Sequence, residues 1–289
     1  MLQVGEDAGV QVSMVGPAEI RFTDSESLLG LKVRYGRGIV QMTQAGQIAT
    51  ISIAGTTFIA TSESEDAALA FEVMHLRELG SDPMIEQNHR TEVELTSASG
   101  AFSIEGLASP LELSPGAQVT VNMDDADTSE LRTPLILPIW IDPEIDTGSL
   151  ESEAADSLLE LIRSDESESL LLSRRVALGF RRNEVAALAG KSMLALGDAS
   201  AYFGVDGLLS KTGQRLYWSS HLDALRALVD RSAEDAAAVR TAIAGQNADM
   251  DNADGDTLFR LIVGYSQDQL KTGGDADLVA DLESLSMPV

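Results

Sequence analysis

The sequence predicts a segregated α+β protein, with an N-terminal antiparallel β-sandwich or jelly-roll-like domain and a C-terminal helical bundle or short HEAT-like domain. Apolar residues alternate with period two before about residue 137 and recur with helical period after about residue 148. Seven of the eight prolines lie at or before Pro143, and an interior proline costs a helix about 3 kcal/mol. We expect a β domain over 1–130, a packed connector over 131–148 and a helical domain over 149–289.

Short alternating segments in the first part predict about ten strands. Apolar side chains alternate there with polar or small ones, as in strands with one face on a core and one in solvent. Glycine and proline pairs between them, as at 16–17 and 36–38, predict turns. This spacing is typical of a sandwich or jelly roll. The clearest predicted strands lie at 10–14, 20–22, 31–35, 48–53, 57–61, 69–73, 92–95, 111–113 and 119–121.

The segment between the two parts is stiffened by proline and rich in apolar residues. Pro134, Pro138 and Pro143 restrict its backbone. The aliphatic residues of 135–141, together with Trp140, are too apolar for a free linker. We therefore expect this connector to pack against both parts, with Trp140 at their interface.

Apolar stripes of helical period predict six or seven helices in the second part. Ser149 is the expected N-cap of the first helix, with Glu151 and Glu153 in its first turn. Ser232 with Asp235 resembles a capping box and predicts a helix that ends near Gly245. The predicted stripes are Leu150–Ala154–Leu158–Leu161–Ile162, Val185–Leu188–Ala189–Ser192–Leu196, Trp218–Leu222–Leu225–Val229, Leu258–Leu261–Ile262–Tyr265 and Leu278–Val279–Leu282–Leu285.

Composition excludes several classes of function. The formal net charge of -26 is shared by both halves and repels phosphate backbones and anionic lipids, so we expect no nucleic-acid partner. The chain has no cysteine, which excludes disulfides, thiolate metal sites and thiol nucleophiles. No stretch has the roughly 20 apolar residues of a membrane helix, and the first residues lack the features of a signal peptide.

No motif in the sequence predicts a catalytic, cofactor or metal site. Gly190-Lys191-Ser192 resembles the end of a phosphate loop, but Val185 replaces its first glycine and the context is helical. The aspartates at 249–256 lack the ligand spacing of a calcium loop, and a solvated loop is the expected alternative. The three histidines, at positions 75, 89 and 221, are far apart in the sequence. We expect no cofactor, no metal and no catalytic residue.

Two clusters are candidates for partner binding. The arginines 174, 175, 181 and 182 lie within nine residues of a strongly acidic chain. They predict either pairing with acidic helices of the same chain, through Glu160, Asp165, Glu166 or Glu168, or a docking site for an acidic partner, including a second copy. Tyr217 and Trp218 begin a helix in a chain with 4% aromatic residues. Burial is the expected role of this pair, whereas an exposed indole would indicate contact with a protein or a sugar. The candidate partner-binding residues are therefore Arg174, Arg175, Arg181, Arg182, Trp140, Tyr217 and Trp218.

Five glycine-punctuated segments form a recurrent pattern: VGPAEI at 15–20, LKVRYGRGIV at 31–40, GTTF at 55–58, LAFEV at 69–73 and LSPG at 113–116. The pattern resembles FecR-type domains, the extracytoplasmic β-domains of membrane-anchored regulators that work with sigma factors. RRNEVAALA at 181–189, LYW at 216–218 and LFRLIVGYS at 258–266 make the whole chain similar to the planctomycete version with a helical segment. The resemblance implies an extracytoplasmic, periplasmic location and a membrane anchor before Met1. A complete chain would instead be cytoplasmic.

These observations leave three hypotheses for function. The first is a non-enzymatic, envelope-facing module of a sigma-factor-linked signalling protein that binds a ligand or a protein. The second is a carbohydrate-binding or adhesive β-sandwich with a helical accessory domain, which an exposed aromatic platform on the β part would favour. The third is a hydrolase with a site invisible in the sequence, which a deep pocket with a carboxylate of raised pKa would favour.

Overall fold

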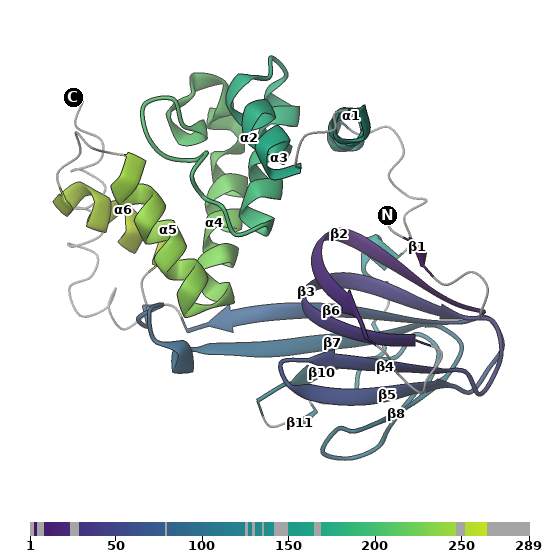
Figure 1. Cartoon of the computed structure of the whole chain (residues 1–289). Coiled ribbons are helices and arrows are strands. Elements are labelled where there is room, and N and C mark those ends of the chain that lie inside the picture. Colours follow the sequence, from purple (N-terminus) through teal and green to yellow (C-terminus); the bar gives the residue numbers. More distant parts are fainter. Residues whose placement is uncertain are drawn as a thin grey trace. The chain divides into compact units, whose positions relative to one another are not determined.

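The computed structural model has a strand-rich N-terminal part followed by helices, which confirms the segregated α+β class (Figure 1). It describes residues 3–4, 9–23, 29–78, 80–124, 127–128, 131–134, 136–141, 150–164, 169–246 and 252–264. The chain forms two compact units. Unit 1 comprises Met1–Leu76 and Arg90–Ile145, and unit 2 comprises Arg77–His89 and Asp146–Val289.

The described strands belong to one hydrogen-bonded sheet, and the described α-helices belong to unit 2. The strands are β1 (Gln3–Val4), β2 (Val10–Phe22), β3 (Leu29–Met42), β4 (Ile48–Ile53), β5 (Thr56–Ser62), β6 (Ala67–Arg77), β7 (His89–Ser99), β8 (Phe102–Glu105), β9 (Leu111–Leu113), β10 (Gln118–Asn122) and β11 (Asp127–Thr128). The helices are α1 (Leu150–Ser164), α2 (Ser169–Gly179), α3 (Asn183–Ala195), α4 (Trp218–Arg231), α5 (Ala233–Gln246) and α6 (Asn252–Val263), with 3₁₀-helices at Glu86–Asn88, Ile139–Ile141, Leu208–Ser210 and Thr212–Tyr217.

The long strand β3 joins two halves of the sheet. Its first half, from Leu29 to Val33, pairs with β4, and its second half, from Gly36 to Met42, pairs with β6. The change of partner occurs at Gly36, whose φ of 113° is available to glycine but strained for other residues. β2 follows β3 along both halves and shifts register between Val15 and Glu19. The predicted turns at 16–17 and 36–38 are therefore bends inside two continuous strands.

The two halves of the sheet enclose one apolar core. One half has the order β3-β4-β5-β8-β9 and the other β3-β6-β7-β10-β11. A single cluster of buried side chains draws on both, including Ile51 and Phe58 from the first half and Phe71 and Leu95 from the second. The β3–β4 pair is parallel, so the expectation of a purely antiparallel arrangement was wrong at this point. A parallel pair needs a crossover, and residues 34–47 supply it by taking β3 through its second half before β4 begins.

The described part of the predicted connector packs on unit 1. Trp140 and Ile141 lie against Ile39 and Ala70 on the face of the sheet away from the main core. The guanidinium of Arg37 stands 5.7 Å from the centre of the Trp140 ring and pairs with Glu72 at 2.8 Å. The connector thus covers small side chains of the sheet. Contact of Trp140 with the helical part stays a prediction.

The helices of unit 2 bury much of the predicted stripes, but Leu196 at the end of the second stripe is 58% exposed, and the stripe on α4 is partly exposed. Ala154, Leu158, Val185 and Ala189 are buried as expected. On α4, however, the buried face runs through His221, Leu225, Leu228 and Val229, whereas Trp218 and Leu222 are 42% and 39% exposed. The predicted stripe was therefore wrong in its first turn, because helical spacing alone does not say which of two adjacent faces meets the core.

The start of α5 confirms the predicted capping box. The Asp235 backbone N–H donates to Ser232 Oγ at 3.1 Å, and the Ser232 hydroxyl donates to the Asp235 carboxylate at 2.8 Å. Arg231 donates to the same carboxylate from its Nε at 2.6 Å. The first of these bonds satisfies a backbone N–H that the helix end leaves without an intrahelical partner, and the other two hold the Asp235 carboxylate in place. The predicted stripe at 278–285 lies outside the described residues.

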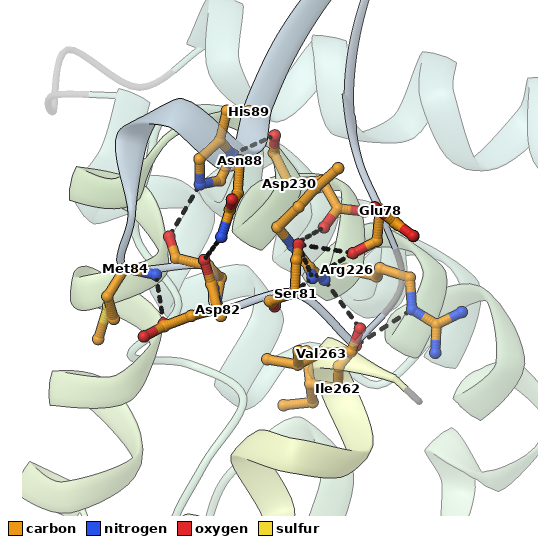
Figure 2. Close-up of polar contacts among 12 residues, drawn as sticks. Glu78, Ser81, Asp82, Met84, Asn88, His89, Arg226, Asp230, Ile262 and Val263 are labelled. Carbon is orange, nitrogen blue, oxygen red and sulfur yellow. Dashed lines mark hydrogen bonds and ion pairs between the residues drawn. The ribbon is translucent and has the colours of Figure 1, made fainter. Parts of the chain in front are cut away.

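The segment Arg77–His89 belongs to unit 2, and the buried side chain of Arg77 holds it to the helices there. Figure 2 labels two of its acceptor residues on the helices, Asp230 and Val263. The Arg77 side chain is fully buried, and its Nε donates to Asp230 Oδ1 of α4 at 2.9 Å. Its Nη2 donates to the carbonyl of Val263 at 2.8 Å, at the end of α6. Its Nη1 donates to the carbonyls of Glu78 and Ser81. Nothing in the sequence around Arg77 predicts this cluster, because its acceptors lie up to 186 residues away.

Candidate protein-binding surface

Two short stretches of unit 2 bring basic and apolar side chains together. The first is the link between α2 and α3, and the second is the 3₁₀-helix Thr212–Tyr217 with the first turn of α4. We name the exposed side chains of these stretches the basic–aromatic surface. Its members are Phe180, Arg181, Arg182, Arg215, Leu216, Trp218 and Leu222.

Asn183, at the start of α3, joins the two stretches. Its carbonyl accepts a hydrogen bond from Gln214 Nε2 at 3.1 Å. Its side chain lies against Gly213, where a Cβ would stand 2.6 Å from Asn183 Oδ1. A larger residue at Gly213 would displace the Asn183 side chain. Lys211 also donates to the carbonyls of Ala177 and Leu178 at the end of α2.

The apolar members of the surface are unusually exposed. Leu216 is 91% exposed, Trp218 42%, Leu222 39% and Phe180 38%. Trp218 and Leu222 are four residues apart on α4 and therefore share one helix face. The guanidinium of Arg215 lies 5.9 Å from the centre of the Trp218 ring, within the range of a cation–π contact. The indole is thus exposed and oriented, as expected for a protein-contact residue.

The surface carries positive charge in a negative chain. Between Ser169 and Leu222 the sequence has seven basic and three acidic residues, against a net charge of -26 for the whole chain. Arg174, Arg175, Arg181 and Arg182 are all exposed. Arg182 also lies 3.8 Å from Glu153 of α1 and 4.0 Å from Glu184. Such exposed pairs contribute about 0–1 kcal/mol, so they leave Arg182 able to contact another molecule.

Tyr217 and Trp218, predicted as a pair, have different positions. The Tyr217 ring is half-buried and stands 6.5 Å from the ring of His221, centre to centre. Trp218 faces solvent. The sequence did not lead us to predict Phe180, Arg215, Leu216 and Leu222 as members of the surface. The basic Arg215 next to the apolar Leu216 was the feature that could have indicated them.

A buried polar network, formed by Gln214 and His221, lies within the stretches that carry the basic–aromatic surface. Gln214 is 1% exposed, and its Oε1 lies 3.1 Å from Nε2 of the fully buried His221. Because the Gln214 amide nitrogen donates to Asn183, its oxygen is the acceptor, and His221 Nε2 carries the proton. The ring of Tyr202 packs edge-on against His221 at 5.2 Å. Burial, with a smaller contribution from Lys191, lowers the pKa of His221 to about 4.

We expect unit 2 to lose stability as the pH falls from about 6.5 to about 4. The folded pKa of His221 lies below the ordinary value of 6.5, so the unfolded chain binds the proton more tightly and protonation favours unfolding. The shift corresponds to about 3 kcal/mol at most. Urea unfolding at several pH values should show a shallower pH dependence in His221→Gln than in the parent chain. Equal slopes in the two chains would contradict the assignment.

The other motifs have structural roles or lie outside the description. Gly190 lies inside α3, where a Cβ would stand 2.3 Å from Leu208 Cδ1 and 3.1 Å from the Tyr202 hydroxyl. Close packing therefore accounts for this glycine, and the helical backbone there is not a phosphate loop. In the aspartate cluster at 249–256, Asp249 and Asp251 lie outside the described residues, whereas Asp254 and Asp256 belong to α6, and Asp256 pairs with Arg240 at 2.9 Å. The described part of the chain contains no group of three His, Cys, Asp or Glu residues able to hold a metal.

Among the described residues, Glu94 and Asp230 are carboxylates of raised pKa. Burial, and secondarily the charge of Glu72, raise the pKa of Glu94 on β7. A cavity of about 320 Å³ in unit 1 is lined by other residues, with Asp66 as its carboxylate. Burial also raises the pKa of Asp230, but Asp230 is paired with Arg77. Neither Glu94 nor Asp230 lines this cavity.

Comparisons with known proteins give two distant structural similarities. No family model matches the chain, and no curated protein matches it. A crystal structure of a provisionally assigned anti-sigma factor from Parabacteroides distasonis has a TM-score of 0.31 and 12% identity, over 46% of this chain and 55% of that one. A second, with the same description and source, has a TM-score of 0.35 and 11% identity, over 58% and 71%. The match thus spans about half the length of the first structure.

Proposed function

We propose that this chain is a non-enzymatic, protein-binding module of a signalling protein, and that it binds an acidic partner through the basic–aromatic surface. The observation that carries the proposal is the exposure of Leu216 and of Trp218, whose ring lies 5.9 Å from Arg215. They stand on a stretch that is hydrogen-bonded to the one carrying the exposed Arg181 and Arg182. The similarity of the β part to FecR-type domains supports a role in sigma-factor-linked signalling at the cell envelope.

The chemistry of the surface defines the partner. Apolar side chains at a protein contact are stabilised by removal from water, at about 25 cal/mol per Å². Arginines around them favour carboxylates and disfavour basic partners. An amphipathic helix with acidic residues beside leucines offers both groups at the spacing of Trp218 and Leu222. The acidic remainder of the chain would repel such a helix elsewhere, which directs it to this surface.

Binding of a designed peptide tests the proposal. The probe is an 18-residue amphipathic helix of leucine and glutamate, and the chain carries Trp140→Phe so that Trp218 is the single tryptophan. We expect a saturable change in Trp218 emission as the peptide binds. The affinity should fall with added salt, because the charges are exposed. Arg181→Glu with Arg182→Glu should weaken binding at least tenfold, and Leu216→Ser should also weaken it.

Two controls separate this site from general charge effects. Arg240→Glu reverses a charge on α5, away from the basic–aromatic surface, and should leave the affinity nearly unchanged. A peptide with lysine in place of glutamate should not bind. Equal affinity of the two peptides, or binding unaffected by the reversal at 181 and 182, would overturn the proposal. Self-association in sedimentation experiments, abolished by the same reversal, would assign the surface to a second copy instead.

A further inference from the structure

A cavity in unit 1 lies over four neighbouring strands and shares no residue with the basic–aromatic surface. It has a volume of about 320 Å³ and is lined by the beginning of β2, the end of β3, the beginning of β6 and the end of β7. Gln11 pairs in register with Gln41, and Gln41 with Ala68. The small Ala68 side chain leaves space beside the two glutamines.

Several polar groups of the cavity wall are able to form further hydrogen bonds. Within the described residues, the side-chain amides of Gln11 and Gln41 and the Asp66 carboxylate form no hydrogen bond. Thr43 Oγ1 donates to the carbonyl of Gly9 at 3.2 Å, and Ser99 Oγ donates to the carbonyl of Asp66 at 3.0 Å. Both hydroxyl oxygens can still accept a hydrogen bond.

Two of the residues that line the cavity have a positive φ. Gly9 has a φ of 72°, and a Cβ there would lie 2.7 Å from both Thr43 Oγ1 and Gln47 Nε2. Asp66 has a φ of 51°, a conformation that aspartate and asparagine adopt more readily than most residues. Both residues line the cavity, and a side chain at position 9 would crowd Thr43 and Gln47.

The chemistry of the wall selects the class of ligand. Amide groups donate and accept, a carboxylate only accepts, and none of the described residues that line the cavity is basic. Groups that both donate and accept, such as hydroxyls, therefore match it, and anions do not. The volume is at the lower end of ligand pockets, which suits a ligand of one or two sugar rings.

We propose that this cavity binds a neutral, polyhydroxylated ligand of the size of a mono- or disaccharide. Gln11 and Gln41 would contact its hydroxyls from the cavity wall, and Asp66 would accept from a hydroxyl at the rim. The proposal goes beyond the protein-binding function, since it concerns other residues of the other unit.

Titration of the full, isotope-labelled chain with neutral sugars tests the proposal by amide NMR. The probes are glucose, galactose, mannose, N-acetylglucosamine and the disaccharides maltose and cellobiose. We expect at least one to give saturable shifts at residues 9–11, 41–43, 66–68 and 99, with a dissociation constant on the order of 1 mM. Gln41→Leu should weaken binding roughly tenfold, the equivalent of one lost hydrogen bond.

Matched variants distinguish specific sugar binding in the cavity from unspecific contact of the sugar with the protein surface. Gln44→Leu changes an exposed glutamine that does not line the cavity and should leave the shifts unchanged. Glucuronate should bind more weakly than glucose, and Asp66→Asn should reduce this difference. The absence of saturable shifts with every probe, or shifts that persist in Gln41→Leu, would overturn the proposal.

Discussion

Replacing Arg77 with methionine should destabilise unit 2 by about 3–5 kcal/mol, the usual cost of removing one partner from a buried ion pair. The guanidinium donates to Asp230 and to three backbone carbonyls, at distances from 2.7 to 3.0 Å. Methionine has a similar apolar stem but no donor, so these buried oxygens would lose their partner. Urea unfolding followed by Trp218 fluorescence, in a chain with Trp140→Phe, measures the loss.

An exposed arginine provides the matched control. Arg240 pairs with Asp256 at the same distance of 2.9 Å, but both side chains are about half exposed. Arg240→Met should therefore cost less than about 1 kcal/mol. The deficit of Arg77→Met should also shrink as the pH is lowered from 7 to 5. Without Arg77, the already raised pKa of Asp230 rises further, and protonation removes the unpaired buried charge. A deficit equal to that of the control would contradict this role of Arg77.

Phe71→Ala should destabilise unit 1 by about 3–5 kcal/mol, in the range measured for large core aromatics. Phe71 is fully buried on β6 and lies in register with Gly38 of β3. A Cβ at Gly38 would stand 2.5 Å from Phe71 Cζ and 2.9 Å from Met14 Sδ. The ring thus occupies the space that the glycine leaves open. Urea unfolding followed by Trp140 fluorescence, in a chain with Trp218→Phe, measures the loss.

A double-mutant cycle tests this complementarity. Gly38→Ala alone should cost about 1–3 kcal/mol, because the added methyl group overpacks the core. In the Phe71→Ala chain the same substitution should be nearly neutral or stabilising, because the ring has gone. The coupling between the two positions should therefore exceed about 1 kcal/mol. Additive effects would show that the ring does not depend on the glycine.

The sequence predicted local structure best where neighbouring residues decide it. The capping box of Ser232 and Asp235 needs residues only three positions apart, and it forms as expected. The prediction of turns at 16–17 and 36–38 was wrong, because residues far away in the sequence decide the structure there. Glycine there permits either a turn or a bend, and pairing with distant strands decides between them.

The candidate surface was predicted only in part. The arginines and Trp218 were recognisable as unusual residues in an acidic, aromatic-poor chain. The two stretches that carry these residues are joined by the bond between Gln214 and Asn183, 31 residues apart. The exposure of Trp218 depends on which face of α4 meets the core, and helical spacing alone allowed the opposite answer. The cavity in unit 1 combines residues from four strands, so no local pattern could indicate it.

The sequence alone determined the fold class, the change from strands to helices and the exclusion of cysteine chemistry, because composition and hydrophobic period are properties of short stretches of chain. Only the tertiary structure decided that β3 would join two halves of a sheet and that Arg77 would be buried beside Asp230. It also decided that Trp218 would face solvent. Each of these depends on contacts between residues far apart in the chain, where the free energy of packing, rather than local preference, selects the outcome.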